Sequence, residues 1–167
     1  DVDLRYFTDK NSNVFGIKVS TRKKVGWRLA YNRITDQGRF LFPREWGREF
    51  LFTFQKRERS EGIRDGHTLL LGFTRPFIFG KNKLNTDVNI GRHWTPDVTN
   101  ASANKYAMPD YCHINLDLSY QNENLRGFAP EILITHKASR NGNVENPNIQ
   151  LNKVDMWHFS LILNYRF

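Results

Sequence analysis

The chain has a single cysteine, Cys112, and no run of apolar residues long enough to form a membrane-spanning helix. A lone thiol excludes a disulfide framework and a cysteine-based metal cluster. A spanning helix needs about 18 or more consecutive apolar residues, so helical insertion is excluded too. No secretory leader precedes Asp1, which lies inside a predicted strand. We therefore expect either a leader that has been removed or a fragment of a longer protein, and favour the fragment.

Signatures of catalysis are also missing. The sequence contains no glycine-rich phosphate loop and no nucleophile motif. None of the histidines lies at metal-ligand spacing from a second ligand; they are His67, His93, His113, His136 and His158. The sequence therefore predicts no enzyme, no cofactor and no bound metal.

Positive charges outnumber negative ones in this chain. The net charge is +8 and the isoelectric point about 9.8, a balance that often indicates a nucleic-acid partner. The 25 Lys and Arg residues are scattered among 17 acidic ones, however, and no basic helix or recognition motif appears. We predict no nucleic-acid binding, because a cationic pore or contact with lipopolysaccharide phosphates accounts for the charge equally well.

Aromatic residues are abundant although hydrophobic residues make up only 39% of the chain and the mean hydropathy is -0.63. There are 13 Phe, 6 Tyr and 4 Trp residues. Membrane β-barrels look hydrophilic on average, since their strands alternate apolar and polar residues, and they place aromatics in two interfacial belts. An aromatic-rich soluble β-domain fits the composition as well.

Short runs with a period of two dominate the chain and predict antiparallel β-structure in a single domain, residues 1–167. We expect eight strands, over 1–9, 14–21, 25–35, 62–74, 83–93, 111–120, 126–138 and 151–167. The connections 36–61, 94–110 and 139–150 are long, 74–82 is moderate, and the others are short. Long connections at every second position favour an up-and-down transmembrane barrel.

The last predicted strand has the clearest alternation. Five apolar or aromatic residues share one face, namely Phe159, Leu161, Leu163, Tyr165 and Phe167. The other face carries His158, Ser160, Ile162, Asn164 and Arg166. A terminal Phe on such a strand resembles the signal by which the barrel-assembly machinery of the outer membrane recognises its substrates. The alternative is an amphipathic edge strand of a soluble sandwich.

Aromatic residues also fall near both ends of the predicted strands, as the two belts of a membrane barrel require. One belt would contain Tyr165, Phe128, Tyr120 and Phe73, and the other Trp157, Tyr111, Trp94 and Tyr31. Two features fit less well. The run Leu69 to Leu71 places a leucine on an inward face, and Pro130 cannot donate to a ladder, so we expect a bulge or a late strand start there.

Charged residues predicted to face inward fall into two groups. Arg5, Lys18 and Arg28 lie on three successive strands and could form a basic ladder that guides anions or carboxylates. The alternative is a set of unaligned, solvated charges. Asp87, His113, Asp117 and Glu131 would face the lumen from the other side. A basic wall opposite an acidic wall suits zwitterionic solutes or amino acids.

The segment 42–62, FPREWGREFLFTFQKRERSEG, mixes charges with aromatics and predicts a folded loop. Arg–Glu pairs within it are expected to tie it down. A loop that folds into the lumen would narrow a pore, whereas the alternative is a loop packed on the rim. The segment resembles a loop of the OprD-type substrate-specific outer-membrane porins, which show similar Pro-Arg-Glu-Trp-Gly-Arg and Arg-Glu-Arg-x-Glu-Gly runs.

The resemblance implies an 18-stranded monomeric barrel in the bacterial outer membrane that admits small, often carboxylate-bearing solutes. This chain would supply about eight C-terminal strands, with lipid and lipopolysaccharide around it. The loop would be one of the family's constriction loops, with Arg44, Glu45, Trp46 and Arg48 near the narrowest point. The missing first half, together with many Asn and Lys residues, departs from the family's pattern.

Two other interpretations remain open. A complete eight-stranded outer-membrane barrel with a structural or surface-interaction role would not conduct, because side chains fill so small an interior. Such closure requires the first predicted strand to pair with the last. A soluble, lipocalin-like binding domain is the other alternative.

Overall fold

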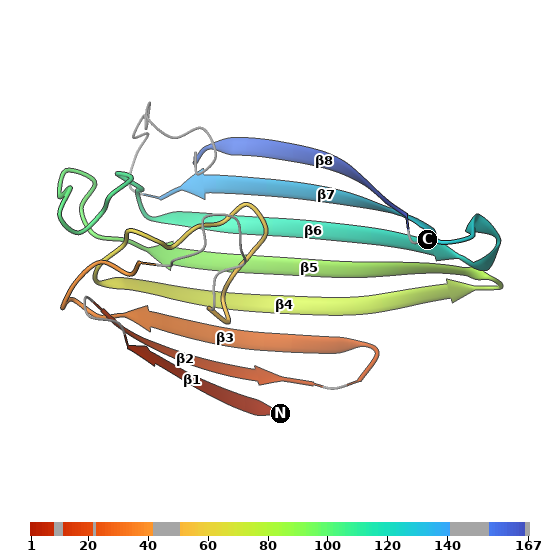
Figure 1. Ribbon diagram of the computed structural model, residues 1–167, viewed down its shortest axis with the longest axis horizontal. Coiled ribbons are helices and arrows are strands. Elements are labelled where there is room, and N and C mark those ends of the chain that lie inside the picture. Colours follow the sequence, from red (N-terminus) through yellow and green to blue (C-terminus); the bar gives the residue numbers. More distant parts are fainter. Residues whose placement is uncertain (9–11, 22, 42–50, 141–153, 166–167) are drawn as a thin grey trace.

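Eight antiparallel strands form one sheet in which each strand pairs with its neighbours in the sequence, in the order β1 to β8 (Figure 1). The structure, a computed structural model, describes residues 1–8, 12–21, 23–41, 51–140 and 154–165. The strands are β1 (Val2–Thr8), β2 (Asn13–Ser20), β3 (Gly26–Ile34), β4 (Gly66–Phe79), β5 (Asn82–Trp94), β6 (Tyr111–Asn122), β7 (Phe128–Ser139) and β8 (Met156–Tyr165). A 3-10 turn, η1 (Glu123–Leu125), is the one helical element in this part of the chain. The predicted all-β, up-and-down antiparallel architecture is confirmed.

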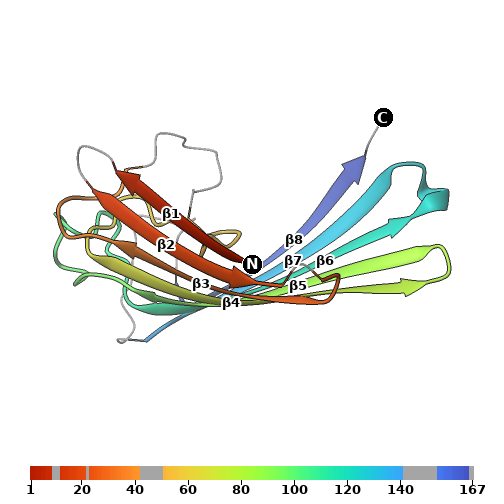
Figure 2. The ribbon, with the colours of Figure 1, turned by 90° about the horizontal axis from the view of Figure 1, so that it is seen from below.

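The connections divide the sheet into two unlike ends. Tight turns join β2 to β3, β4 to β5 and β6 to β7 at one end, while the long connections gather at the other (Figure 1). Figure 2 shows the strand direction rotating steadily from β1 to β8, so that the sheet curves as twisted sheets do. We call the face on which residues 51–65 lie the concave face, and the opposite face the convex face.

The hairpin between β4 and β5 corrects the prediction of a loop over 74–82. β4 continues to Phe79, which pairs with Asn82, and only Gly80 and Lys81 form the turn. Gly80 has a φ of 59°, a left-handed conformation that glycine adopts at little cost and that two-residue hairpin turns require. At its other end β4 begins at Gly66 rather than residue 62.

Pro130 lies inside β7 without the expected bulge or late start. It pairs with Leu163 in a ladder with β8 that continues without interruption from Phe128 to Lys137. The ladder with β6, in contrast, ends at Glu131, so Pro130 lies where β7 has a neighbour on one side only. A proline is tolerated at such a position because the missing donor interrupts no second ladder.

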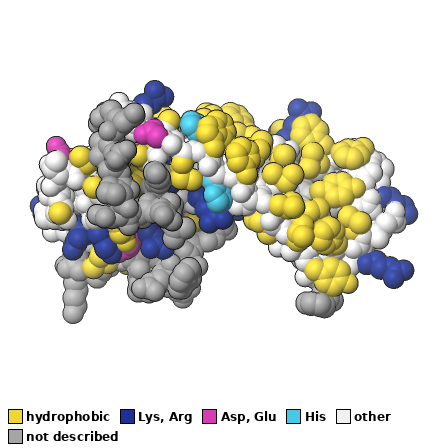
Figure 3. Space-filling view, turned by 90° about the horizontal axis from the view of Figure 1, so that it is seen from above, with side chains coloured by type: hydrophobic (Ala, Val, Ile, Leu, Met, Phe, Trp, Pro, Cys, Tyr) yellow, Lys and Arg dark blue, Asp and Glu magenta, His cyan; other side chains and the backbone are white. Residues whose placement is uncertain are grey.

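Apolar side chains cover the convex face. On β8, Leu161, Leu163 and Tyr165 are 68%, 62% and 56% exposed, with Trp157 and Phe159 on the same face. Other exposed residues of this face are Leu4, Ile17, Leu29, Leu71, Ile90, Ile114 and Ile132. In Figure 3 hydrophobic side chains form a broad patch over the half of the molecule that carries the tight turns. Phe167 lies outside the described residues.

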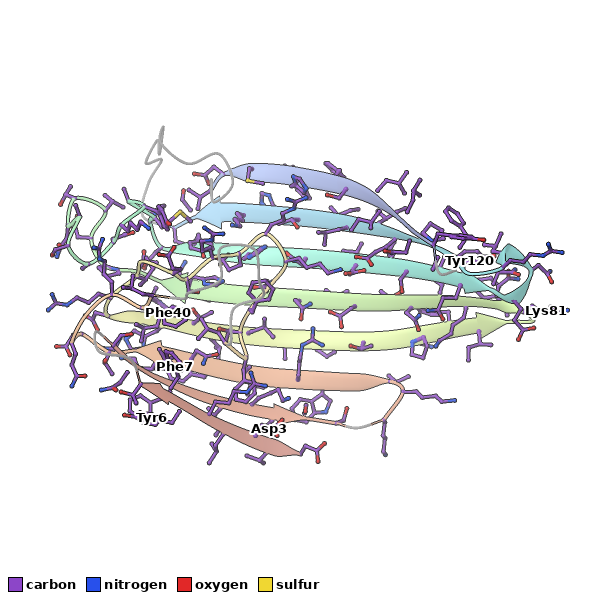
Figure 4. The ribbon with its side chains drawn as sticks, viewed as in Figure 1. Asp3, Tyr6, Phe7, Phe40, Lys81 and Tyr120 are labelled. Atoms are coloured by element: carbon purple, nitrogen blue, oxygen red, sulfur yellow. The ribbon has the colours of Figure 1, made fainter. Side chains whose placement is uncertain are left out.

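Buried apolar side chains lie mainly at the loop end. Phe40 and Leu51 pack with Val14, Ile34 and Ile63, and the ring of Phe7 meets that of Phe40 edge-on, with 6.3 Å between centroids. Figure 4 places Phe7 and Phe40 at this end, and Tyr120 and Lys81 at the opposite end. Leu70 is only 1% exposed, on the inward face predicted for it. The core of the described chain therefore fixes the loops to the sheet.

Candidate functional site

Residues 51–65 cross the concave face from β3 to β8. Near the start of this crossing segment, the backbone N–H of Thr53 donates to Asn32 Oδ1 of β3 at 3.0 Å. Further on, Asn115 Nδ2 of β6 donates to the carbonyl oxygen of Lys56 at 2.9 Å. Arg57 Nη2 then donates to a hydroxyl of β8, Ser160 Oγ, at 3.2 Å. The segment is thus hydrogen-bonded to strands in both halves of the sheet, β3 in one and β6 and β8 in the other.

Two inward-facing glycines make room for this segment. A Cβ atom on Gly91 would lie 2.1 Å from Gln55 Oε1, and one on Gly16 would lie 3.0 Å from Phe52 Cδ2. Gln55 Nε2 also donates to the carbonyl oxygen of His113, at 3.3 Å. A larger residue at Gly91 would force the Gln55 side chain to move, and one at Gly16 would press on Asn32 and Phe52, so both glycines leave room for side chains that hold the segment.

A hollow of about 740 Å³ lies between the crossing segment and the sheet, on the side of the tight turns. Its described lining includes all three residues of the predicted basic ladder and three of the predicted acidic-wall residues. These are Arg5, Lys18 and Arg28, and Asp87, Asp117 and Glu131. The basic residues come from β1 to β3 and the acidic ones from β5 to β7. The structure thus brings these six predicted residues to one hollow, although their action on a solute stays a prediction.

The basic side chains of the hollow have partners. Arg28 binds both carboxylate oxygens of Asp87, at 2.8 and 3.0 Å. Gly72 permits this contact across β4, because a Cβ there would lie 2.6 Å from Arg28 Nε. Lys18 pairs with Asp3 at 2.6 Å. The Arg5 guanidinium lies 4.0 Å from the ring centre of Phe52, within the range of a cation–π contact.

The acidic wall is met by a lysine of the crossing segment. Lys56 Nζ forms ion pairs with both Asp117 and Glu131. Burial alone would lower the pKa of Lys56, but its hydrogen bonds to these two carboxylates outweigh burial and raise it. The ammonium group therefore stays charged at neutral pH.

A buried cluster around Glu58 anchors the far part of the segment. The Glu58 side chain is 1% exposed; its Oε2 accepts a hydrogen bond from His113 Nδ1 at 2.9 Å and pairs with Lys137 Nζ at 3.5 Å. Tyr111 donates its hydroxyl to Oε1, and His93 stacks on the Tyr111 ring with centroids 4.3 Å apart. Burial would raise the pKa of Glu58, but Lys137 and the two histidines hold it well below its usual range.

Glu58, His93 and His113 also form a donor set of the kind that zinc prefers. One ligating atom from each lies within 4.8 Å of the others, and all three side chains are buried. Sequence spacing could not indicate this set, because strand pairing and the crossing segment bring together residues far apart in the chain. The fully buried ammonium of Lys137 already supplies the positive charge that Glu58 needs, and it would repel a second cation. We therefore interpret the cluster as an anchor.

The remaining predicted site residues have mixed outcomes. Arg44, Glu45, Trp46 and Arg48 lie outside the described residues. His113 lies on the concave face, as predicted, but is covered by the crossing segment rather than lining the hollow. Tyr111, predicted for an aromatic belt, is 2% exposed on the concave face, so that assignment is wrong.

The sequence analysis missed several residues of the site, among them Phe52, Lys56, Glu58 and Lys137. The expected Arg–Glu ties partly involve residues 42–50, which lie outside the described residues; among the described ones, Glu58 binds Lys137, His113 and Tyr111, and Glu61 binds Lys105 at 3.2 Å. Lys137 could have been found, because it lies an even number of residues from Glu131 in the same strand and therefore faces inward with it. Lys56 and Glu58 carry no such signal, since their segment has no period.

Within the described ranges no helix is both long and apolar enough to cross a membrane. Comparison with protein-family models, with curated proteins and with solved structures found no match for the chain.

Proposed function

We propose that the chain forms part of an outer-membrane β-barrel of the OprD type, and that its concave face lines a water-filled pore for small carboxylate-bearing or zwitterionic solutes. The observation that carries the proposal is the polarity of the two faces. Leucine, isoleucine and aromatic side chains project from the convex face, while charged and amide side chains line the hollow. This is the arrangement of a barrel with lipid outside and water inside.

The same observation disfavours a soluble, lipocalin-like domain. Such barrels enclose their ligand in an apolar interior and present polar residues to water. Here Leu161 and Leu163 project from the sheet, and the hollow is lined by Arg28, Asp87 and Asp117. In water the convex face would be an exposed apolar surface with a strong tendency to associate.

The sheet order favours a large barrel over an eight-stranded one. Among the described residues β1 and β8 are the two edges of the sheet and do not pair with each other. An eight-stranded barrel has an interior that side chains fill, whereas this sheet holds the crossing segment and a hollow of about 740 Å³. We infer that further strands complete the barrel, and the resemblance to the OprD type suggests a total of 18.

Reconstitution of the full-length protein tests the proposal. We expect heat-modifiable mobility on gels, extraction only with detergent, and discrete conductance steps in planar bilayers. Neutralising Arg5 and Lys18 together (Arg5→Gln, Lys18→Gln) should shift ion selectivity toward cations and slow the uptake of carboxylate solutes. A protein that is monodisperse in buffer without detergent, or inserted protein that does not conduct, would overturn the proposal.

A further inference from the structure

We propose that Lys56 is a determinant of charge selectivity in the hollow, because its ammonium group offsets one of the two negative charges of the Asp117–Glu131 pair. The inference rests on the proposed function and concerns the same site. It assigns selectivity to a side chain of the crossing segment, in addition to the strand residues that form the walls.

The two acids that Lys56 meets are neighbours on adjacent strands. Asp117 of β6 and Glu131 of β7 are offset by two residues along the ladder, because Ser119 pairs with Glu131 and Asp117 with Leu133. Each carboxylate side chain is 18% exposed, and both bind the same Nζ atom. Asp87 is already held by Arg28 in a bidentate pair. Asp117 and Glu131 are therefore the acids whose effect on a passing ion depends on Lys56.

The position of Lys56 is fixed by its own backbone and by the anchor two residues later. Asn115 Nδ2 holds the carbonyl oxygen of Lys56 at 2.9 Å, and Glu58 is bonded to Tyr111, His113 and Lys137. The ammonium is thus held in place by the segment that crosses the face. Its side chain is 37% exposed, so it also faces the hollow.

The charges of the hollow show why this lysine matters. Its described lining carries four cations, Arg5, Lys18, Arg28 and Lys56, against the three acids Asp87, Asp117 and Glu131, a net charge of +1. Asp3, the partner of Lys18, lies beside this lining and is not included in the count. Without the Lys56 charge the net is zero, and two uncompensated carboxylates face the hollow on one wall. Cations would then be attracted to that wall and anions repelled from it.

The decisive experiment compares Lys56→Met with Lys105→Met in the full-length protein, by reversal potentials under a KCl gradient in planar bilayers. Lys105 pairs with Glu61 at 3.2 Å among the long connections, and its loss changes the net charge of the protein equally. One elementary charge about 8 Å from the ion path in water changes the cation-to-anion permeability ratio about fivefold. We expect that shift toward cations for Lys56→Met, little change for Lys105→Met, and near wild-type selectivity for Lys56→Arg.

A second variant keeps the inference testable if Lys56→Met fails to insert. The double variant Asp117→Asn, Glu131→Gln leaves the lysine charge without its acids, and should shift selectivity toward anions. Unchanged selectivity in Lys56→Met would overturn the inference but not the proposed function. If Lys56→Met does not insert, unchanged selectivity in the double variant would do the same. An equal shift in Lys105→Met would do so too, since net charge rather than position would then decide. A wild-type protein that forms no channels would instead overturn the proposed function.

Discussion

Replacing Glu58 with glutamine tests whether residues 51–65 are held on the concave face by one buried carboxylate. The change preserves the size of the side chain and removes its charge. In the wild-type protein Glu58 pairs with Lys137, whose side chain is fully buried. After the substitution the Lys137 ammonium has lost its counter-charge in a site from which water is largely excluded. Residues 51–65 must then detach from the concave face, or Lys137 must lose its proton.

The size of the effect follows from this burial. Removing one partner of a buried ion pair costs about 3–5 kcal/mol, because the remaining charge is left uncompensated. The Glu58 and Lys137 side chains are 1% and 0% exposed, so the full range applies. That free energy corresponds to an increase on the order of a hundredfold or more in the population with the segment unseated. The eight strands do not depend on Glu58, and we expect them to remain paired.

Limited proteolysis with trypsin measures this population, because cleavage follows the open form when opening is fast. The segment supplies four cleavage sites, at Lys56, Arg57, Arg59 and Arg64. We expect Glu58→Gln to speed cleavage there, and the double variant Glu58→Gln, Lys137→Met to recover much of the protection, since it removes both charges. Equal cleavage rates in wild type and Glu58→Gln would show that the carboxylate does not hold the segment.

Two further predictions concern pH and lipid. Although burial opposes it, the pKa of Glu58 in the folded protein lies well below its ordinary value of 4.5, because Lys137 and the two histidines are close to its carboxylate. Its contribution is therefore complete above about pH 5 and is lost as the pH falls through the depressed pKa. Between pH 7 and 5 the contribution of Glu58 should therefore not change, and the amides of residues 51–65 should stay equally protected from hydrogen exchange. A loss of protection in this range that occurs in the wild type but not in Glu58→Gln would contradict the prediction. Leu161→Arg should lower the amount of membrane-inserted protein, since a lipid-facing arginine at mid-bilayer costs about 2–4 kcal/mol. Ile162→Arg, on the concave face opposite Glu131, should not. Equal insertion of the two variants would count against a lipid-facing convex surface.

The strands could be predicted because their side-chain alternation follows directly from the geometry of pairing. Where other signals were given more weight than alternation, the prediction was wrong. Tyr111 was assigned to a belt from its place at a strand end, although it shares parity with His113 and Asn115 and therefore faces inward. The loop predicted over 74–82 failed for a related reason: the pairing continues through Pro76 to a turn that Gly80 makes possible.

The crossing segment could not be predicted in the same way. Its sequence indicated a folded loop, but its seat depends on contacts with strands that are distant in sequence, such as Thr53 with Asn32 and Arg57 with Ser160. These contacts have no period and involve side chains of many types. The two walls of the hollow were predictable because they follow strand parity, whereas the lysine that joins one of them was not.

The edge formed by β8 bears on the size of the proposed barrel. Soluble sheets protect their edges with lysine, proline, bulges or very short strands, since an open row of backbone groups invites pairing. β8 is ten residues long, its residues Met156–Tyr165 contain no lysine or proline, and its ladder with β7 is regular. Its convex side chains, Leu161 and Leu163 among them, are exposed on that face, and covering them with an apolar environment would be favourable. In the proposed barrel a further strand would pair with the edge of β8, and lipid would cover its convex side chains. β1 is poorly suited as that strand, because direct closure of eight strands would leave no room for a hollow that already holds Phe52 and Lys56.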